Sequence, residues 1–267
     1  MPQARFTDVR RFDSIDSTNR YLLDEARDGA PEGVVAVADH QTAGRGRLGR
    51  TWEAPAGANL LFSVLLRPAI DPGDRHLATT AVALAAVDAI GAIGLAEVGI
   101  KWPNDLVDPI GRKIAGVLAE ADVSSSGAPA APGAPGGPPA PVVVGIGINV
   151  NWPGDDAELP PELRGLATSL RHLSGTAVDR EALLEALLDA LGTRVDDLAS
   201  SGGRARLADD LRRACTTVGT RVRVDLAHES FEGTATGISP AGHLAVGTDG
   251  GTRLVVAGDV VHVRPGS

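Results

Sequence analysis

Residues 44–50 alternate glycine with arginine, in the sequence GRGRLGR, in a loop that follows an apolar run. Glycine allows backbone N–H groups to approach a ligand closely, and guanidinium groups neutralise several negative charges in one place. The segment is not a P-loop, because the GxxxxGK[ST] pattern is absent. A solvated surface loop is the simple alternative for such a run by itself. Residues 44–50 are therefore a candidate anion-binding loop that needs support from the rest of the chain.

Residues 101–105, KWPND, place an amide beside a carboxylate. Pro103 fixes a turn that presents Asn104 next to Asp105. Trp52, one of three tryptophans, ends the glycine–arginine loop and has a face on which a nucleotide base could stack. Each feature alone has an ordinary explanation, a common turn or a core tryptophan. Together with the loop they favour a site for an anionic ligand.

Lysine is rare in this chain. Of its 25 basic residues only Lys101 and Lys113 are lysines, and the others are arginines. The compact ammonium of lysine is not interchangeable with a planar guanidinium. Both lysines fall in the region that is densest in motifs, which favours a role for an ammonium group there.

The bulk composition excludes several classes of protein. A net charge of −9 argues against a general nucleic-acid binder. The single cysteine, Cys215, cannot form an internal disulfide, which fits a reducing cytosol; because it follows the run ADDLRRA, we interpret it as a helix residue and not a nucleophile. The N-terminus has no apolar signal region, and no apolar run reaches the roughly 18 residues of a membrane span. We therefore expect an unexported, cytoplasmic protein that does not enter membranes.

Hydrophobic periodicity and turn residues predict the elements that position these motifs. The glycines of GIGIN, 145–149, do not make a dinucleotide fingerprint, since Val150 holds the third glycine position, and they predict a strand that allows close ligand approach. The Ser/Ala/Gly/Pro run 124–141 is predicted to be a disordered hairpin tip. The predicted elements are a helix after the N-cap Ser17; strands 34–40 and 59–67; a buried helix 74–93; a hairpin at 99–107; strands 113–123 and 142–151; helices 179–198, capped by Asp179, and 205–214; and short β runs from 218 onward.

Six short motifs follow one another in an order that resembles the catalytic core of biotin protein ligases. They are SerThrAsn at 17–19, GlnThrAlaGlyArgGlyArg at 41–47, Trp52, KWPND, ArgLysIleAlaGly at 112–116 and GIGIN. The resemblance implies an α+β fold: a class II aminoacyl-tRNA synthetase-like mixed, largely antiparallel sheet flanked by helices, with a small C-terminal SH3-like β barrel. It implies a catalytic domain over 1–216, which contains the predicted disordered run 124–141 as an insertion, and a β domain over 217–267.

The resemblance also implies roles for individual residues. Lys113, Arg47 and Asp105 would be catalytic, and no metal ligand is assigned. Leu48 stands where some members carry a further arginine, and the role of Lys101 stays open. Biotin would be held by Ser17, Thr18, Asn19, Gln41, Arg45, Gly46, Arg47, Lys113, Gly116 and Gly145, and ATP by Arg47, Arg50, Trp52, Asn104, Asp105 and Asn149.

The implied activity is the joining of biotin to ATP, with Mg²⁺, to give biotinyl-5'-AMP, and transfer of biotin to a lysine of a biotin carboxyl carrier domain of acyl-CoA or pyruvate carboxylase. Because biotin's carboxyl group is already ionised at neutral pH, the burden is electrostatic, and a closing glycine–arginine loop would shield the adenylate from water. Only sixteen residues precede Ser17, so we expect no DNA-binding domain, and we expect a monomer or weak homodimer.

Three alternatives stay open at this point. A lipoate or octanoate ligase shares the fold and the acyl-transfer chemistry. A DNA-binding regulator that senses a small ligand is disfavoured by the negative charge, and a non-catalytic nucleotide-binding module would bind ATP without turning it over.

Overall fold

The structure, a computed structural model, describes residues 5–95, 97–121, 139–226, 228–256 and 258–262. The predicted disordered insertion, 124–141, lies outside the described residues except for its last three positions. None of the described helices combines the length and the hydropathy that a bilayer crossing requires.

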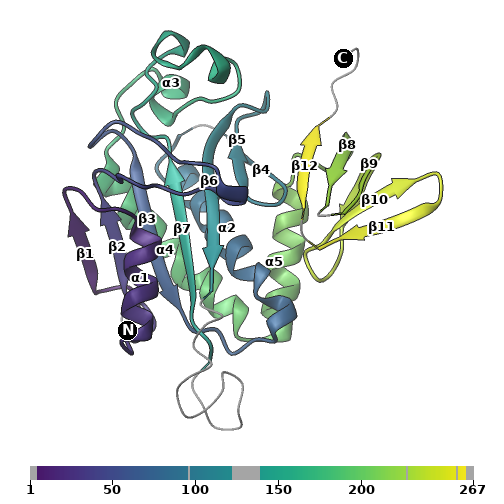
Figure 1. The fold of residues 1–267 in the computed structure, drawn as a ribbon, viewed down its shortest axis with the longest axis horizontal. Coiled ribbons are helices and arrows are strands. Elements are labelled where there is room, and N and C mark those ends of the chain that lie inside the picture. The colour runs from purple at the N-terminus through teal and green to yellow at the C-terminus, as the bar shows by residue number, and fades with distance from the viewer. Residues whose placement is uncertain (1–4, 96, 122–138, 227, 257, 263–267) are drawn as a thin grey trace.

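A seven-stranded sheet forms the centre of the molecule, in the order β1-β2-β3-β7-β6-β5-β4 (Figure 1). Among these described strands the pair β1 and β2 is parallel, and the other neighbours pair antiparallel. The prediction of a mixed, largely antiparallel sheet is therefore confirmed. The strands are β1 (Val9–Phe12), β2 (Val35–Ala38), β3 (Leu60–Leu66), β4 (Gly99–Lys101), β5 (Asp105–Val107), β6 (Lys113–Glu120) and β7 (Val142–Ile148).

The sheet is covered on both faces because its central strands are apolar on both sides. Helix α1 (Thr18–Arg27), capped as predicted by Ser17, packs its Leu22 and Ala26 against one face. Helix α2 (His76–Ala92) is buried nearly all round and packs against the other face with α4 (Arg180–Leu198). The predicted helix 74–93 thus exists, with a 3-10 turn at Pro72–Asp74 before it.

Two further helices follow the sheet, α3 (Leu170–Ser174) and α5 (Ser201–Ala214). The predicted start of α5 at 205 is wrong by four residues. Ser200 caps the helix by accepting from Gly203 N at 3.0 Å, so the helix runs through two glycines whose low helix propensity hid its start. Strand β1 was not predicted, since its four residues VRRF show no clear alternation.

A second sheet of five antiparallel strands lies beside α5, at the right of Figure 1. Its order is β11-β10-β9-β8-β12, and β11 and β12 do not pair among the described residues, so the expected barrel is not closed by hydrogen bonds. Buried side chains of this sheet belong to the same apolar cluster as α2 and α4. The strands are β8 (Arg221–Asp225), β9 (Ser230–Ile238), β10 (Leu244–Thr248), β11 (Gly251–Val255) and β12 (Asp259–His262).

Candidate active site

A cavity of about 50 Å³ opens over β6 and β7, where the start of α1 and the 44–52 loop approach the sheet. Six separate segments contribute to its wall. The cavity has room for a few water molecules. Its wall consists of Ser17, Thr18, Asn19, Gln41, Arg45, Gly46, Arg47, Trp52, Phe62, Ser63, Asn104, Lys113, Gly116, Val117, Leu118, Gly145, Ile146 and Gly147.

Glycines on β6 and β7 make space for the side chains that cross the sheet. A Cβ on Gly147 would lie 2.5 Å from Cε2 of Trp52, and one on Gly116 would lie 3.0 Å from Nζ of Lys113. A Cβ on Gly145 would lie 3.0 Å from Cγ of Asn19 and nearer still to its Oδ1. The glycines therefore fit the predicted strand that allows close approach, although here the approaching groups are the chain's own side chains.

Positive charge gathers at one end of the cavity. Lys113 Nζ lies 2.8 Å from Asp105 Oδ1 and 5.4 Å from the centre of the Trp52 ring. Arg47 donates to Asn104 Oδ1 at 2.9 Å, and burial lowers the pKa of its guanidinium, which still stays protonated at neutral pH. Two cations on different segments thus meet beside one amide and one carboxylate.

The second sheet touches the glycine–arginine loop. Arg47 also donates to Gly258 O at 2.9 Å, and Arg50 pairs with Asp259 Oδ2 at 2.7 Å. The start of β12 therefore fixes the position of two loop arginines, a contact that no local pattern in the chain predicted.

Neutral polar groups line the other end of the cavity. Thr18 donates its backbone N–H to Gln41 Oε1 at 2.8 Å, and its hydroxyl lies 2.7 Å from Ser63 Oγ. Ser63 donates to Asn19 Oδ1 at 2.6 Å. Asn19 Nδ2 donates to Glu120 Oε2 at 2.8 Å, and Arg45 pairs with the other oxygen of Glu120 at 3.1 Å. This end thus presents mainly hydrogen-bonding groups, and the charge of Arg45 is paired with that of Glu120.

A larger and mostly apolar cavity of about 350 Å³ adjoins the first one. The two share Arg47, Asn104, Val117 and Leu118. The second cavity lies between the start of α2, the KWPND turn and the second sheet, with Trp102 in its wall. Arg47 thus borders both cavities.

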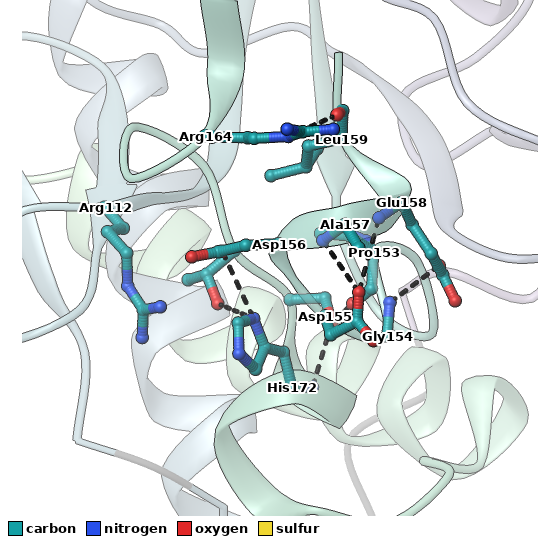
Figure 2. A network of polar contacts seen from close by, with 12 residues as sticks. Arg112, Pro153, Gly154, Asp155, Asp156, Ala157, Glu158, Leu159, Arg164 and His172 are labelled. Carbon is teal, nitrogen blue, oxygen red and sulfur yellow. Dashed lines mark hydrogen bonds and ion pairs between the residues drawn. The ribbon is translucent and has the colours of Figure 1, made fainter. Parts of the chain in front are cut away.

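Figure 2 shows that the segment after β7 is held by its own polar groups. Asp155 caps the 3-10 turn Asp156–Glu158, and Glu158 accepts from Gly154 N at 2.8 Å. On α3, Nδ1 of His172 lies 3.9 Å from Oδ1 of Asp156. The same segment lines a wide surface cavity of about 760 Å³, opposite Gln41.

All ten residues predicted to hold biotin line the 50 Å³ cavity, and so do three of those predicted to hold ATP, Arg47, Trp52 and Asn104. Asp105 reaches the cavity through Lys113, whereas Arg50 is exposed and turned to Asp259. Lys101 lies outside the cavity wall. Burial lowers the pKa of His262, and the charge of Lys101 lowers it further.

Asn149, predicted to contact the nucleotide, is held by hydrogen bonds within the protein. It is 7% exposed, its Nδ2 donates to Thr168 O at 3.0 Å, and its Oδ1 accepts from Asn59 at 3.2 Å. Both amide atoms are thus used inside the protein, and Asn149 does not belong to the wall of either adjoining cavity. Each amide atom keeps one further hydrogen-bonding position, so the nucleotide contact of Asn149 stays a prediction.

The residues of the site that the sequence did not single out include Ser63, Gly147 and Glu120. Ser63 is fully buried and is the one polar residue of the strand LLFSVLL, a signal that was available. Gly147 belongs to a motif that was recognised, but its packing against Trp52 was not predicted. Glu120 ends β6 and carried no local signal, because its partners come from α1 and from the loop.

Sequence profiles of two families match the chain. The biotin/lipoate A/B protein ligase family matches residues 11–127, and the biotin protein ligase C-terminal domain matches residues 217–263. The chain is 39% identical over 254 residues to a biotin--[acetyl-CoA-carboxylase] ligase of Mycobacterium tuberculosis, covering 93% of this chain and 86% of that one. It is 33% identical over 248 residues to the bifunctional ligase/repressor BirA of Bacillus spizizenii, covering 93% of this chain and 72% of that one.

A solved structure has the same fold over nearly the whole chain. It is the biotin protein ligase of Aquifex aeolicus in complex with biotin and ATP, 25% identical, with a TM-score of 0.77, covering 97% of this chain and all of that one. A single-residue variant of that enzyme in complex with biotin is 26% identical and gives a TM-score of 0.78, covering 97% of this chain and 99% of that one.

Proposed function

The chain belongs to the biotin protein ligase family, and we propose that it adenylates biotin with ATP and transfers the biotinyl group to a lysine of a carrier protein. One observation carries the proposal: the ten residues expected to hold biotin converge on one cavity from separate segments. The relatives above are named biotin ligases, and one solved relative holds biotin and ATP together. The lipoate alternative is less supported, since the C-terminal domain of biotin protein ligases also matches.

The first step joins two anions. The carboxylate of biotin attacks the α-phosphorus of ATP, an acyl–phosphate bond forms, and pyrophosphate leaves. Biotin's carboxyl group is ionised at neutral pH, so no base is required, and the residues must stabilise charge instead. Arg47 and Lys113 are proposed to do this, with Asp105 orienting Lys113 through their 2.8 Å contact.

The second step transfers the acyl group. The amine of the carrier lysine attacks the acyl carbon, AMP leaves, and an amide bond remains on the carrier. Until then the mixed anhydride must be kept from water. The 44–52 loop, tied to Gly258 and Asp259 of the second sheet, is the proposed shield, and the remaining ATP contacts are proposed at Arg50, Trp52, Asn104 and Asn149.

Magnesium would enter with the nucleotide. Among the described residues no three His, Cys, Asp or Glu side chains gather to form a metal site, so that part of the chain offers no cage of its own. Such an arrangement fits Mg²⁺, which is usually bound by substrate phosphates, waters and one or two carboxylates. Asp105 is the carboxylate that pairs with Lys113, and its negative charge also favours the protonated form of Arg47 by raising the pKa of that guanidinium.

We further propose a catalytic part over 1–216 and a β domain over 217–267, which the separate matches to 11–127 and 217–263 support. The acceptor is proposed to be a biotin carboxyl carrier domain of an acyl-CoA or pyruvate carboxylase. The proposed setting is the cytoplasm, with the enzyme as a monomer or weak homodimer.

Mass spectrometry of a purified carrier domain tests the proposal. After incubation with the protein, ATP, Mg²⁺ and biotin, the carrier should gain one biotinyl group, and omission of ATP should prevent the gain. Lipoate and octanoate are offered in parallel reactions. An unmodified carrier in the complete reaction, or preferential attachment of lipoate or octanoate, would contradict the assignment.

A further inference from the structure

Glu120 is the common partner of two cavity residues that come from different parts of the chain. Its Oε2 accepts from Asn19 Nδ2 at 2.8 Å, and its Oε1 pairs with Arg45 at 3.1 Å. Its side chain is 22% exposed, whereas Asn19 is 4% exposed. Glu120 itself does not line the 50 Å³ cavity, although it lines the adjoining cavity of about 350 Å³. Its contacts with the wall of the 50 Å³ cavity are those to Asn19 and Arg45.

Two acceptors, the carboxylate of Glu120 and the backbone carbonyl of Leu118, decide which way round the amide of Asn19 lies. Leu118 O, at 3.1 Å, and Glu120 can only accept hydrogen bonds, so the group facing both of them must be the NH₂. The oxygen of Asn19 then faces Ser63, which must donate to it. A rotated amide would place its oxygen against a carbonyl and a carboxylate.

The direction of the remaining hydrogen bonds follows from this. Ser63 has one proton and gives it to Asn19, so it has none to donate to Thr18; the one hydroxyl proton of Thr18 goes to Ser63 Oγ, at 2.7 Å, or to Gln41 Oε1, at 3.1 Å. Both lone pairs of the Thr18 oxygen then stay free to accept. If Asn19 were rotated, Ser63 would donate to Thr18 and take one of these acceptor positions.

Gln41 supplies the complementary group. Its Oε1 accepts from Thr18 N, so its Nε2 is left as a donor, and that nitrogen donates to none of the described residues. The cavity wall thus offers an acceptor at Thr18 beside a donor at Gln41. A cyclic urea has the matching edge, an N–H next to a C=O, and biotin carries such a group.

We propose that Glu120 is a positioning residue that sets the hydrogen-bond polarity of the cavity for a urea edge. The inference rests on the proposed function, because it names the chemical group that this cavity reads. Glu120 touches no reacting atom, so its removal should weaken recognition of biotin without changing the chemistry that follows.

The test compares Glu120→Met, which removes the acceptor, with Glu120→Gln, which keeps an acceptor oxygen but no charge. Binding of biotin to the full chain is measured by calorimetry, and KM for biotin and for ATP by pyrophosphate exchange. Because one charge-assisted hydrogen bond is lost while Leu118 O remains, we expect about tenfold weaker biotin binding in Glu120→Met. KM for ATP should change less than about threefold, and Glu120→Gln should recover most of the biotin affinity because its oxygen still accepts.

Two ligands show whether the urea is the group that is read. Desthiobiotin keeps the urea and lacks the sulfur, so it should lose affinity for Glu120→Met as biotin does. An analogue that keeps the sulfur-containing ring and the valerate chain of biotin but lacks the urea is measured as an inhibitor of pyrophosphate exchange. It should bind the parent and Glu120→Met equally.

Glu32→Met is the matched control variant, since Glu32 is 26% exposed, pairs with Arg5 and accepts from Arg67 N, away from the cavity. It should bind biotin as the parent does. Equal losses of biotin affinity in Glu120→Met and Glu120→Gln would assign the effect to the ion pair with Arg45, which both variants lack, and would overturn the proposal. Equal losses for biotin and the urea-free acid, or a parallel rise in KM for ATP, would overturn it as well. In each case the parent would still bind and adenylate biotin, and only a parent that fails to bind biotin would remove the proposed function too.

Discussion

Gly145→Ala should damage both the stability of the protein and its binding of biotin. The new methyl group would lie 3.0 Å from Asn19 Cγ and 3.0 Å from Ser63 Oγ, and closer than either to Asn19 Oδ1. Contacts of a real Cβ are ordinary only beyond 3.4 Å. Asn19 lies in the first turn of α1 and is 4% exposed, so it cannot swing into solvent. The amide must shift by about an ångström, which breaks the bonds that fix it.

The magnitude follows from those bonds. The shift breaks the 2.6 Å bond from Ser63 and the 2.8 Å bond to the carboxylate of Glu120. A neutral hydrogen bond contributes about 1 kcal/mol and one to a charged group about 1.5–3 kcal/mol, so the free energy of unfolding should fall by roughly 2–4 kcal/mol. For a chain of this size that is a drop in Tm of about 5–15 °C. Biotin affinity should fall by at least about tenfold, since a misplacement of 1 Å can cost on the order of 10²-fold.

Thermal unfolding and calorimetry with biotin measure the two effects. Gly192→Ala is the matched control, because Gly192 lies inside α4 with nothing within 4 Å of an added Cβ, and it should raise stability by about 0.5–1 kcal/mol. Asn19→Ser combined with Gly145→Ala should recover stability, since the shorter side chain relieves the collision, but not biotin binding. A Gly145→Ala protein with the Tm and biotin affinity of the parent would refute the reasoning.

Four further outcomes are expected. Lys113→Met should slow biotin-dependent pyrophosphate exchange by about 10²–10³-fold. Its Tm should be nearly unchanged, because a partly exposed ion pair contributes only about 0–1 kcal/mol to stability. Exchange within about threefold of the parent rate would remove Lys113 from the first step. Asp259→Asn should increase release of the adenylate into solution a few-fold, measured by chromatography, as the loop loses an exposed ion pair. Cys215 should resist alkylation at about pH 8 until the chain unfolds, since burial raises the pKa of its thiol; rapid labelling of the native protein would contradict this. Burial lowers the pKa of His243 and His262, so the unfolded chain binds more protons than the folded one. The free energy of unfolding should therefore fall as pH drops below about 6.5. Urea titrations at about pH 7.5 and 5.5 measure this free energy, and equal values at the two pH values would count against the prediction.

The sequence by itself was enough to find most elements of the catalytic part, though not β1 or α3, and most residues of its cavity. Periodicity and capping residues are local signals, so Ser17 and Asp179 were predicted as N-caps, and the structure confirms both. The motif order also predicted which residues would meet, and the ten residues expected to hold biotin do line one cavity. Their roles toward biotin and ATP stay predictions.

Tertiary structure alone decided the contacts that join distant segments. Glu120 binds Asn19, about a hundred positions away, and Asp259 binds Arg50 from the second sheet. Asn149 carries a family motif, yet its amide is used by Asn59 and Thr168. No local pattern encodes such pairings, because a hydrogen bond depends on where the fold brings two groups together and not on their spacing along the chain.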